Sequence, residues 1–288
     1  MEEKNQLIKG IKEELELIYR KGARVQELLR RKYNSLTYLT KSEYINGLLL
    51  PQEYAEAKSL INPEMFFLLL IEKFWHLFRI IKKNIENALI QPWVRVIFEH
   101  TCDIFWYFNQ STSKKKYIAC KFWLCTLGLL NGKLNNLSYE DFLNFLDEKE
   151  KLEFLEFQKR GFPEDEFHKK LHTLFPSISK ENLPTFIEDY FKSLKDISLN
   201  KEQLENFYKW LSLYHHPNIL VVSNLEKELE NKSHIFRCFA LMACCGVNLI
   251  DFLGNEILKN PDLIFSCDEK EKIAQLTEKA YEILRNQT

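Results

Sequence analysis

The spacing of the apolar residues is the feature that most constrains the fold of this chain. Between the eight glycines and eight prolines of its 288 residues, apolar side chains recur at intervals of three and four rather than two. This period lines up side chains along one face of an α-helix, whereas a half-buried strand would alternate. The pattern therefore predicts an all-α protein, a helical bundle that contains a short-helix insertion.

Proline, glycine and polar positions predict where the helices begin and end. We expect helices over residues 7–33, 63–90, 93–109, 114–130, 204–216, 233–258 and 268–285. Charged residues mixed with aromatic ones, and breaks at glycine and proline, predict short helices between 138 and 199. The expected organisation is N-terminal bundle helices in residues 1–137, a short-helix subdomain or insertion in 138–199, and C-terminal helices that complete the bundle in 200–288.

Charge and apolar content narrow the range of partners. The 40 basic and 41 acidic residues cancel, so no global positive field draws the chain onto nucleic acid or an anionic membrane. We therefore predict no DNA binding, and any contact with RNA must use a local patch. The apolar stretches 65–81 and 238–247 resemble membrane spans, but the first carries charges and the second is too short. Both are predicted to be core helices, and no membrane partner is expected.

The N-terminal segment and the cysteines bear on the cellular compartment. Residues 1–10 have neither the basic start nor the apolar run of a secretory signal. The seven cysteines are odd in number and irregularly spaced, which favours free thiols over a disulfide framework. A reducing cytoplasm fits these features best.

A first group of polar residues stands where a helix should bury apolar ones. Arg95, Glu99 and Asp103 are spaced four apart, and large apolar residues flank the helical face that they share. Charged side chains in such surroundings need partners. They are either a surface ion pair between Arg95 and Glu99 or part of a functional site.

A second polar group follows the same period. Tyr208, Ser212 and His216 form a stripe on an otherwise apolar helix, which ends at Pro217. Free carbonyls at a helix end favour the imidazolium, so His216 is able to act as acid, base or anion ligand. The alternative is a hydrogen-bonded core histidine. If the two helices pack together, Arg95 would bind a phosphodiester while His216 exchanges protons and Glu99 orients one of them.

The segment from Arg95 to His100 also has the pattern R-x-x-x-x-H. This spacing resembles the signature of the higher-eukaryote and prokaryote nucleotide-binding superfamily. Many of its helical domains are metal-independent RNA-cleaving toxins or antiphage effectors. The resemblance implies that Arg95 binds the phosphate and that His100 promotes attack by the ribose 2′-hydroxyl. Because these proteins commonly build their site across two subunits, it also implies a homodimer.

A second resemblance rests on two motifs together, R-x-x-x-E at the start of an aromatic-rich helix and Y-x-x-x-S-x-x-x-H-P further along the chain. In this combination the chain is similar, over about residues 60 to 255, to a bacterial family of helical proteins of unknown function. That family supplies no reaction. The site residues that this resemblance implies are Arg95, Glu99, Tyr208, Ser212 and His216.

Other chemistries lack a complete set of residues. There is no C-x-x-C pair, and His168 and His172, four apart, have no evident third ligand, so no metal site is predicted. Neither type of glycine-rich phosphate loop occurs, and no cofactor is expected. The lysines of residues 114–116 are either an RNA-contacting cluster or a solvated helix start.

Two functions from different classes follow from these patterns. The first is a metal-independent ribonuclease or toxin-like effector, in antiphage defence, in which Arg95 binds phosphate and either His100 or His216 transfers protons. The second is a non-catalytic helical module that binds a protein partner or a small anionic ligand. Apolar helices rich in aromatic residues favour a homodimer for either function.

Overall fold

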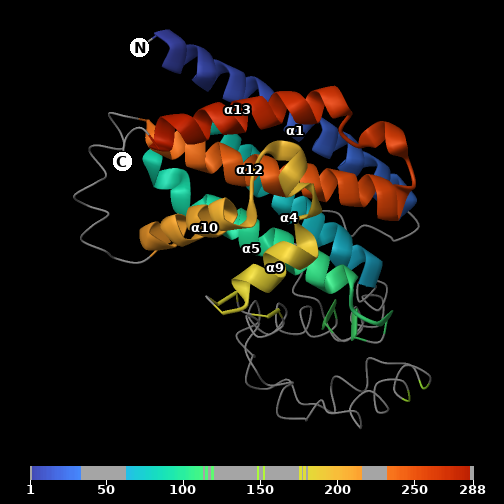
Figure 1. Cartoon of the computed structure of the whole chain (residues 1–288). Helices are drawn as coiled ribbons and strands as arrows, with labels where there is room; N and C mark the ends of the chain where they lie inside the picture. The colour runs from blue at the N-terminus through green and yellow to red at the C-terminus, as the bar shows by residue number, and fades with distance from the viewer. Residues whose placement is uncertain are drawn as a thin grey trace, which may run out of the picture. The chain divides into compact units, whose positions relative to one another are not determined.

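The computed structural model describes residues 2–33, 63–112, 114–115, 118–119, 148, 152, 175–176, 178–179, 181–215 and 232–285. Every regular element in these ranges is a helix, and none of them contains a strand, so the prediction of an all-α protein is confirmed (Figure 1). Of the helix expected over 114–130, residues 114–115 and 118–119 are described and are helical, whereas its remainder and most of the expected insertion lie outside the described residues.

Seven α-helices and four shorter elements lie in the described ranges. The α-helices are α1 (Glu2–Lys32), α4 (Pro63–Lys83), α5 (Gln91–Phe108), α9 (Leu183–Tyr190), α10 (Lys201–His215), α12 (Ser233–Phe252) and α13 (Cys267–Arg285). The shorter elements are the 3₁₀ helices η2 (Ala88–Ile90), η6 (Lys192–Ile197) and η8 (Pro261–Leu263) and the π-helix η7 (Leu253–Leu258).

One helix is shorter than its sequence pattern predicts. The expected helix over 63–90 ends at Lys83, and a turn and η2 separate it from α5. Two asparagines account for this. The side chain of Asn84 donates to the carbonyl of Ile80 at 2.8 Å, and the side chain of Asn87 accepts from the amide of Leu89 at 3.0 Å. Short amide side chains that bond to nearby backbone compete with helix propagation.

The chain divides into two compact units. The first comprises residues 1–29, 71–102 and 178–288, and the second comprises residues 30–70 and 103–177. In the second unit, Phe66 packs edge-on against Tyr107 with ring centroids 5.1 Å apart. The hydroxyl of Tyr107 lies 3.0 Å from the carbonyl oxygen of Pro63 and 3.2 Å from that of Lys115, within donating distance of both. Burial raises the pKa of Tyr107, which keeps this donor protonated.

The core of the first unit is built around α12, which runs through the middle of its helices (Figure 1). Every residue of α12 except Arg237 and Phe252 is buried. The stretch Ser233–Leu258 is long and apolar enough to cross a membrane, and 89% of its most apolar window is buried inside this structure. A helix that is apolar on all sides needs neighbours on all sides, and here other helices of the unit supply them.

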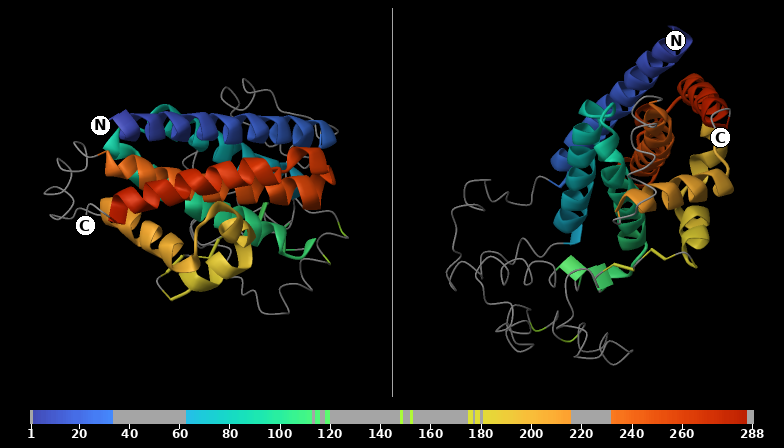
Figure 2. Two further views of the ribbon diagram at one scale, coloured as in Figure 1. Left: turned by 45° about the horizontal axis from the view of Figure 1, so that its top comes forward. Right: turned by 90° about the vertical axis from the view of Figure 1, so that its left-hand side faces the viewer.

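Helices α1 and α13 run side by side along this core (Figure 2). Glu14 of α1 pairs with Lys272 of α13, and further along Lys21 pairs with Glu269 at 2.7 Å. Gly246 of α12 lets α1 approach closely, because a Cβ at this position would lie 2.5 Å from Ile18. Small residues at these contacts therefore set how tightly the helices pack.

Gly22 on α1 provides a test of this packing. A Cβ at Gly22 would lie 2.2 Å from the indole ring of Trp75, a buried ring held by Phe74 and Phe78. Because the ring has no free side to move into, we expect Gly22→Ala to lower the free energy of unfolding by about 1–3 kcal/mol. Urea denaturation measures this loss.

Gly10→Ala is the matched control on the same helix. Its Cβ would meet only the flexible end of Leu276, at 3.2 Å. Since alanine favours helix over glycine by about 1 kcal/mol, this variant should be as stable as the wild type or more so. Equal destabilisation by the two substitutions would contradict the close contact at Gly22.

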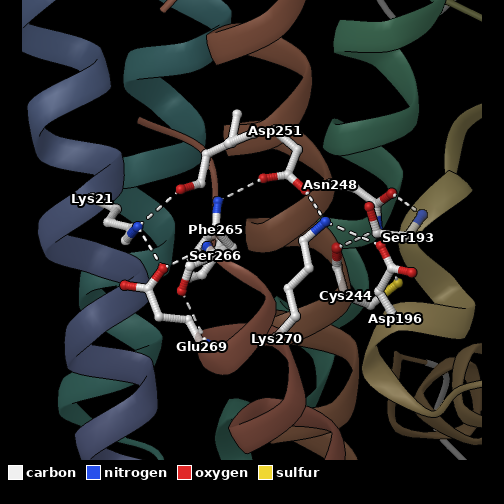
Figure 3. Close-up of polar contacts among 11 residues, drawn as sticks. Lys21, Ser193, Asp196, Cys244, Asn248, Asp251, Phe265, Ser266, Glu269 and Lys270 are labelled. Atoms are coloured by element: carbon white, nitrogen blue, oxygen red, sulfur yellow. Dashed lines mark hydrogen bonds and ion pairs between the residues drawn. The ribbon is translucent and has the colours of Figure 1, made fainter. Parts of the chain in front are cut away.

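A polar network fixes η6 and the start of α13 onto α12 (Figure 3). Lys270 contacts Oδ2 of Asp251 at 2.8 Å and Oδ2 of Asp196 at 3.0 Å. The other oxygen of Asp251 accepts from the amide of Phe265 at 3.0 Å. Burial lowers the pKa of Lys270, but its hydrogen bonds to the two aspartates outweigh burial and raise the pKa overall. The buried carboxylate is thus fully compensated.

Asn248, about one turn before Asp251 on the same face of α12, adds a second contact with η6. Its side-chain oxygen accepts from the backbone amide of Ser193 at 2.9 Å, and its amide nitrogen donates to the carbonyl of Cys244 (Figure 3). Asn248 and Asp251, the residues that interrupt the apolar stretch, are therefore the two that hold η6 and the 265–270 segment in place.

Candidate functional site

Helix α5 presents Arg95 and Glu99 on one face. The helix is unbroken from Gln91 to Phe108, so residues four apart lie one above the other. Nε of Arg95 donates to Oε1 of Glu99 at 2.8 Å. The side chains are 16% and 33% exposed, so the pair lies at the edge of the core rather than on a fully solvated surface.

Helix α10 brings a third group to the same carboxylate. The hydroxyl of Tyr208 donates to Oε1 of Glu99 at 2.8 Å, and the guanidinium carbon of Arg95 lies 5.3 Å from the centre of the Tyr208 ring. Phe98 lies against Tyr208 with ring centroids 5.0 Å apart, and it stacks on Phe191 at the same distance. These three rings hold the hydroxyl in place, and Arg95, Glu99 and Tyr208 are referred to below as the Arg95 cluster.

The protonation states of the two donors follow from their surroundings. Burial alone would lower the pKa of Arg95, but the charge of Glu99 and the hydrogen bonds to Glu99 and Tyr208 outweigh it and raise the pKa. Burial, together with the charge of Glu99, raises the pKa of Tyr208. At neutral pH the cluster therefore consists of a permanent cation and a neutral phenol, both donating to one carboxylate oxygen.

Two atoms of the Arg95 cluster have no partner among the described residues. Nη1 of Arg95 is buried without a hydrogen bond. The donors Arg95 and Tyr208 both use Oε1 of Glu99, and Oε2 of this 33% exposed side chain is left to solvent. A buried donor without a partner costs about 1–3 kcal/mol, so the cluster is incompletely satisfied as it stands. It can hold an anion at Arg95 and accept a proton or a hydrogen bond at Glu99.

The two hydrogen bonds that define this cluster involve none of the other predicted site residues. The hydroxyl of Ser212 donates to the carbonyl of Tyr208, within its own helix, at 2.8 Å. His100 is buried, and five residues of a regular helix turn it about 140° away from Arg95. Asp103 lies one turn beyond Glu99 and belongs to the second unit, whose segment 103–177 begins with it. His216 lies outside the described residues.

Phe98 and Phe191 are residues of the site that the sequence patterns did not identify. Phe98 lies three residues after Arg95, and this helical spacing predicts that the two side chains share a face of the helix. Phe191 follows the end of α9, inside the expected insertion, where no period relates it to α5. Only the fold brings its ring against Phe98.

The lysines of residues 114–116 are described at two of the three positions. Nζ of Lys114 lies 4.9 Å from the ring centre of Trp106, and Nζ of Lys115 lies 4.8 Å from that of Phe108. Burial lowers the pKa of Lys115. In this part of the second unit the two ammonium groups rest on aromatic faces, a favourable cation–π arrangement.

The described residues contain no group of side chains arranged to bind a metal ion. In these ranges no three histidine, cysteine, aspartate or glutamate side chains converge where a metal ion would sit. His168 and His172 fall outside the described residues. Four described cysteines are buried free thiols, and burial raises the pKa of one of them, Cys245, to about 12.

Comparisons with protein-family models, with curated proteins and with solved structures gave no match to this chain. The two resemblances carried by short motifs therefore stay predictions. The Arg95 cluster is the feature of the described structure whose chemistry suggests a function.

Proposed function

We propose that this chain is a metal-independent ribonuclease that binds the scissile phosphate of RNA at Arg95. The observation that carries the proposal is the cluster itself, in which a half-buried arginine with an unpaired Nη1 lies beside a carboxylate with an unpaired Oε2. The R-x-x-x-x-H resemblance is what favours a toxin-like effector of antiphage defence, active as a homodimer, as the biological setting.

The proposed reaction needs an anion ligand, a base and an acid. Glu99 takes the proton of the ribose 2′-hydroxyl, and the 2′-oxygen attacks phosphorus while Arg95 stabilises the added negative charge. The bond from phosphorus to the 5′-oxygen breaks, and this oxygen leaves with a proton from His216. The products are a 2′,3′-cyclic phosphate and a 5′-hydroxyl. Tyr208 keeps Glu99 in position through its hydrogen bond to Oε1.

A specific observation favours a second candidate function. Arg95 and Tyr208 both donate to one oxygen of Glu99, as they would in a closed network that joins α5 to α10. On this hypothesis the chain is a non-catalytic helical module, and the cluster is structural or holds a small anionic ligand. The two candidates differ in a measurable way, because only the first consumes RNA.

Cleavage of labelled RNA in EDTA tests the proposal and identifies the histidine. We expect wild type to cleave RNA without metal, and His216→Ala to lose at least about 100-fold in rate, the usual contribution of a general acid. His100→Ala should keep most of the wild-type activity per folded molecule, because helix geometry places residue 100 about 140° around the helix from Arg95. Intact RNA after incubation with well-folded wild type would contradict the ribonuclease and favour the binding module.

A further inference from the structure

The two unpaired atoms of the Arg95 cluster define what kind of ligand it accepts. Nη1 of Arg95 is a charged donor and requires an acceptor, whereas Oε2 of Glu99 is a charged acceptor and requires a donor. A bare anion satisfies the first and is repelled by the second. The complementary ligand is an anionic oxygen with a hydroxyl group next to it.

Tyr208 determines which oxygen of Glu99 faces a ligand. Its hydroxyl and Nε of Arg95 occupy the same oxygen of Glu99, so Oε1 is engaged twice and Oε2 is the oxygen left for a ligand. The ring of Phe98 packs against Tyr208 and is itself stacked on Phe191, which holds the Tyr208 hydroxyl on this one oxygen of the carboxylate. The Arg95 side chain is 16% exposed but its Nη1 is buried, so a ligand reaches Nη1 only when the side chain moves toward the surface.

From this geometry we infer that Glu99 is the specificity-determining residue of the site, and that it selects a ribose 2′-hydroxyl beside a 3′-phosphate over the 2′-deoxy form. Arg95 binds the phosphate and Oε2 of Glu99 accepts from the 2′-hydroxyl. This inference rests on the proposed function and names how the site distinguishes RNA from DNA. The 2′-hydroxyl is the group that separates the two nucleic acids.

The isosteric substitution Glu99→Gln replaces the acceptor that faces the ligand with a donor. In Glu99→Gln, the amide must use its one oxygen to accept from Arg95 and Tyr208, because both of them are donors. Its NH₂ group then takes the place of Oε2 and is unable to accept from the 2′-hydroxyl. The variant also loses a negative charge next to the bound phosphate, so the phosphate itself should bind as well as before or better.

Calorimetric titration with adenosine 3′-monophosphate and its 2′-deoxy analogue tests the inference, since neither nucleotide contains a bond for the proposed reaction to cleave. Wild type should bind the ribonucleotide about tenfold more tightly, the usual effect of one hydrogen bond to a charged group. Glu99→Gln should lose most of this preference, because its uncharged NH₂ group can only donate to the 2′-oxygen, a weaker contact than that of the hydroxyl with a carboxylate. Arg95→Ala should bind neither, and thermal melting confirms that each variant is folded.

The outcomes separate this inference from the proposed function. Equal affinity of wild type for the two nucleotides, an unchanged ratio in Glu99→Gln, or no binding of either nucleotide would overturn the inference. The expected ratios without any cleavage of RNA would support the inference and contradict the ribonuclease. In His216→Ala, which is expected to cleave slowly, a DNA octamer with one central ribonucleotide should bind more tightly than the mononucleotide. Equal affinity would assign the site to a free nucleotide and contradict RNA as the substrate.

Discussion

Replacement of Arg95 by alanine is expected to lower kcat/KM for RNA cleavage by about 100- to 1,000-fold. A positioned donor that stabilises charge developing in the transition state typically contributes this much. KM should rise, because Arg95 binds the phosphate of the substrate, and kcat should fall, because the negative charge on the phosphate oxygens grows as the 2′-oxygen attacks. Stability should change little, since the pair with Glu99 is partly exposed and such pairs contribute about 1 kcal/mol or less.

Two further variants sharpen the Arg95 measurement. Arg95→Lys keeps the charge but has a single ammonium group, which is unable to bond Glu99 and a phosphate in the planar manner of a guanidinium, so most of the activity should still be lost. Arg24→Ala removes an arginine from an exposed pair with Glu27 on α1 and should leave activity unchanged. Retention of wild-type kinetics by Arg95→Ala, or a loss that only follows unfolding, would remove Arg95 from the mechanism.

The largest expected effect on stability is at Lys270. Lys270→Met leaves Asp251 without its cation, and the Asp251 side chain is only 12% exposed. An uncompensated carboxylate in such surroundings typically costs about 3–5 kcal/mol when it is fully buried. Because Asp251 keeps the amide of Phe265 as a donor and some solvent contact, we expect a loss of about 2–4 kcal/mol in urea unfolding at pH 7.

A second substitution shows whether charge causes this loss. In Lys270→Met/Asp251→Asn the neutral amide can still accept from Phe265, so the double variant should recover part of the lost stability and the two effects should not add. Lys259→Met is the control, because Lys259 belongs to an exposed pair with Glu256 and should change stability by less than about 0.5 kcal/mol. Additive losses would show that the contact with Asp251 does not determine the effect.

The helices could be predicted from the sequence because their signals are local. A period of three and four, with Pro63 and Pro92 at helix starts, places α4 and α5 within a few residues of their observed beginnings. The end of α4 was mispredicted because the apolar period continues through residues that Asn84 and Asn87 turn out of the helix. A side-chain hydrogen bond of this kind depends on conformation and leaves no periodic trace.

The candidate site was predictable only where its contacts are local. The spacing of Arg95 and Glu99 predicts a pair on one helix, and the structure has that contact. The contact between Tyr208 and Glu99 joins residues 109 apart, and only the packing of α10 against α5 creates it. The sequence offered both polar faces but no information on whether they meet, because side-chain period reports the orientation of a residue on its own helix and nothing about the partner helix.

The position of Asp251 in the sequence contains more information than its effect on hydropathy. In the sequence it interrupts an apolar stretch, which argued against a membrane span. A charged residue in an otherwise buried helix also predicts a specific partner, here Lys270 and the amide of Phe265. Partner identity still required the fold, since three other lysines lie between residues 259 and 288.

The ends of the RNA fragments show whether the chain cleaves RNA by attack of the 2′-hydroxyl on a phosphate bound by Arg95. A short RNA oligonucleotide is incubated with wild type and with Arg95→Ala in EDTA, and the products are identified by mass spectrometry. We expect the wild type to give fragments that end in a 2′,3′-cyclic phosphate, paired with fragments that begin with a 5′-hydroxyl. Arg95→Ala should give neither. Fragments with 3′-hydroxyl and 5′-phosphate ends, equal cleavage by the variant, or no cleavage by folded wild type would contradict this mechanism.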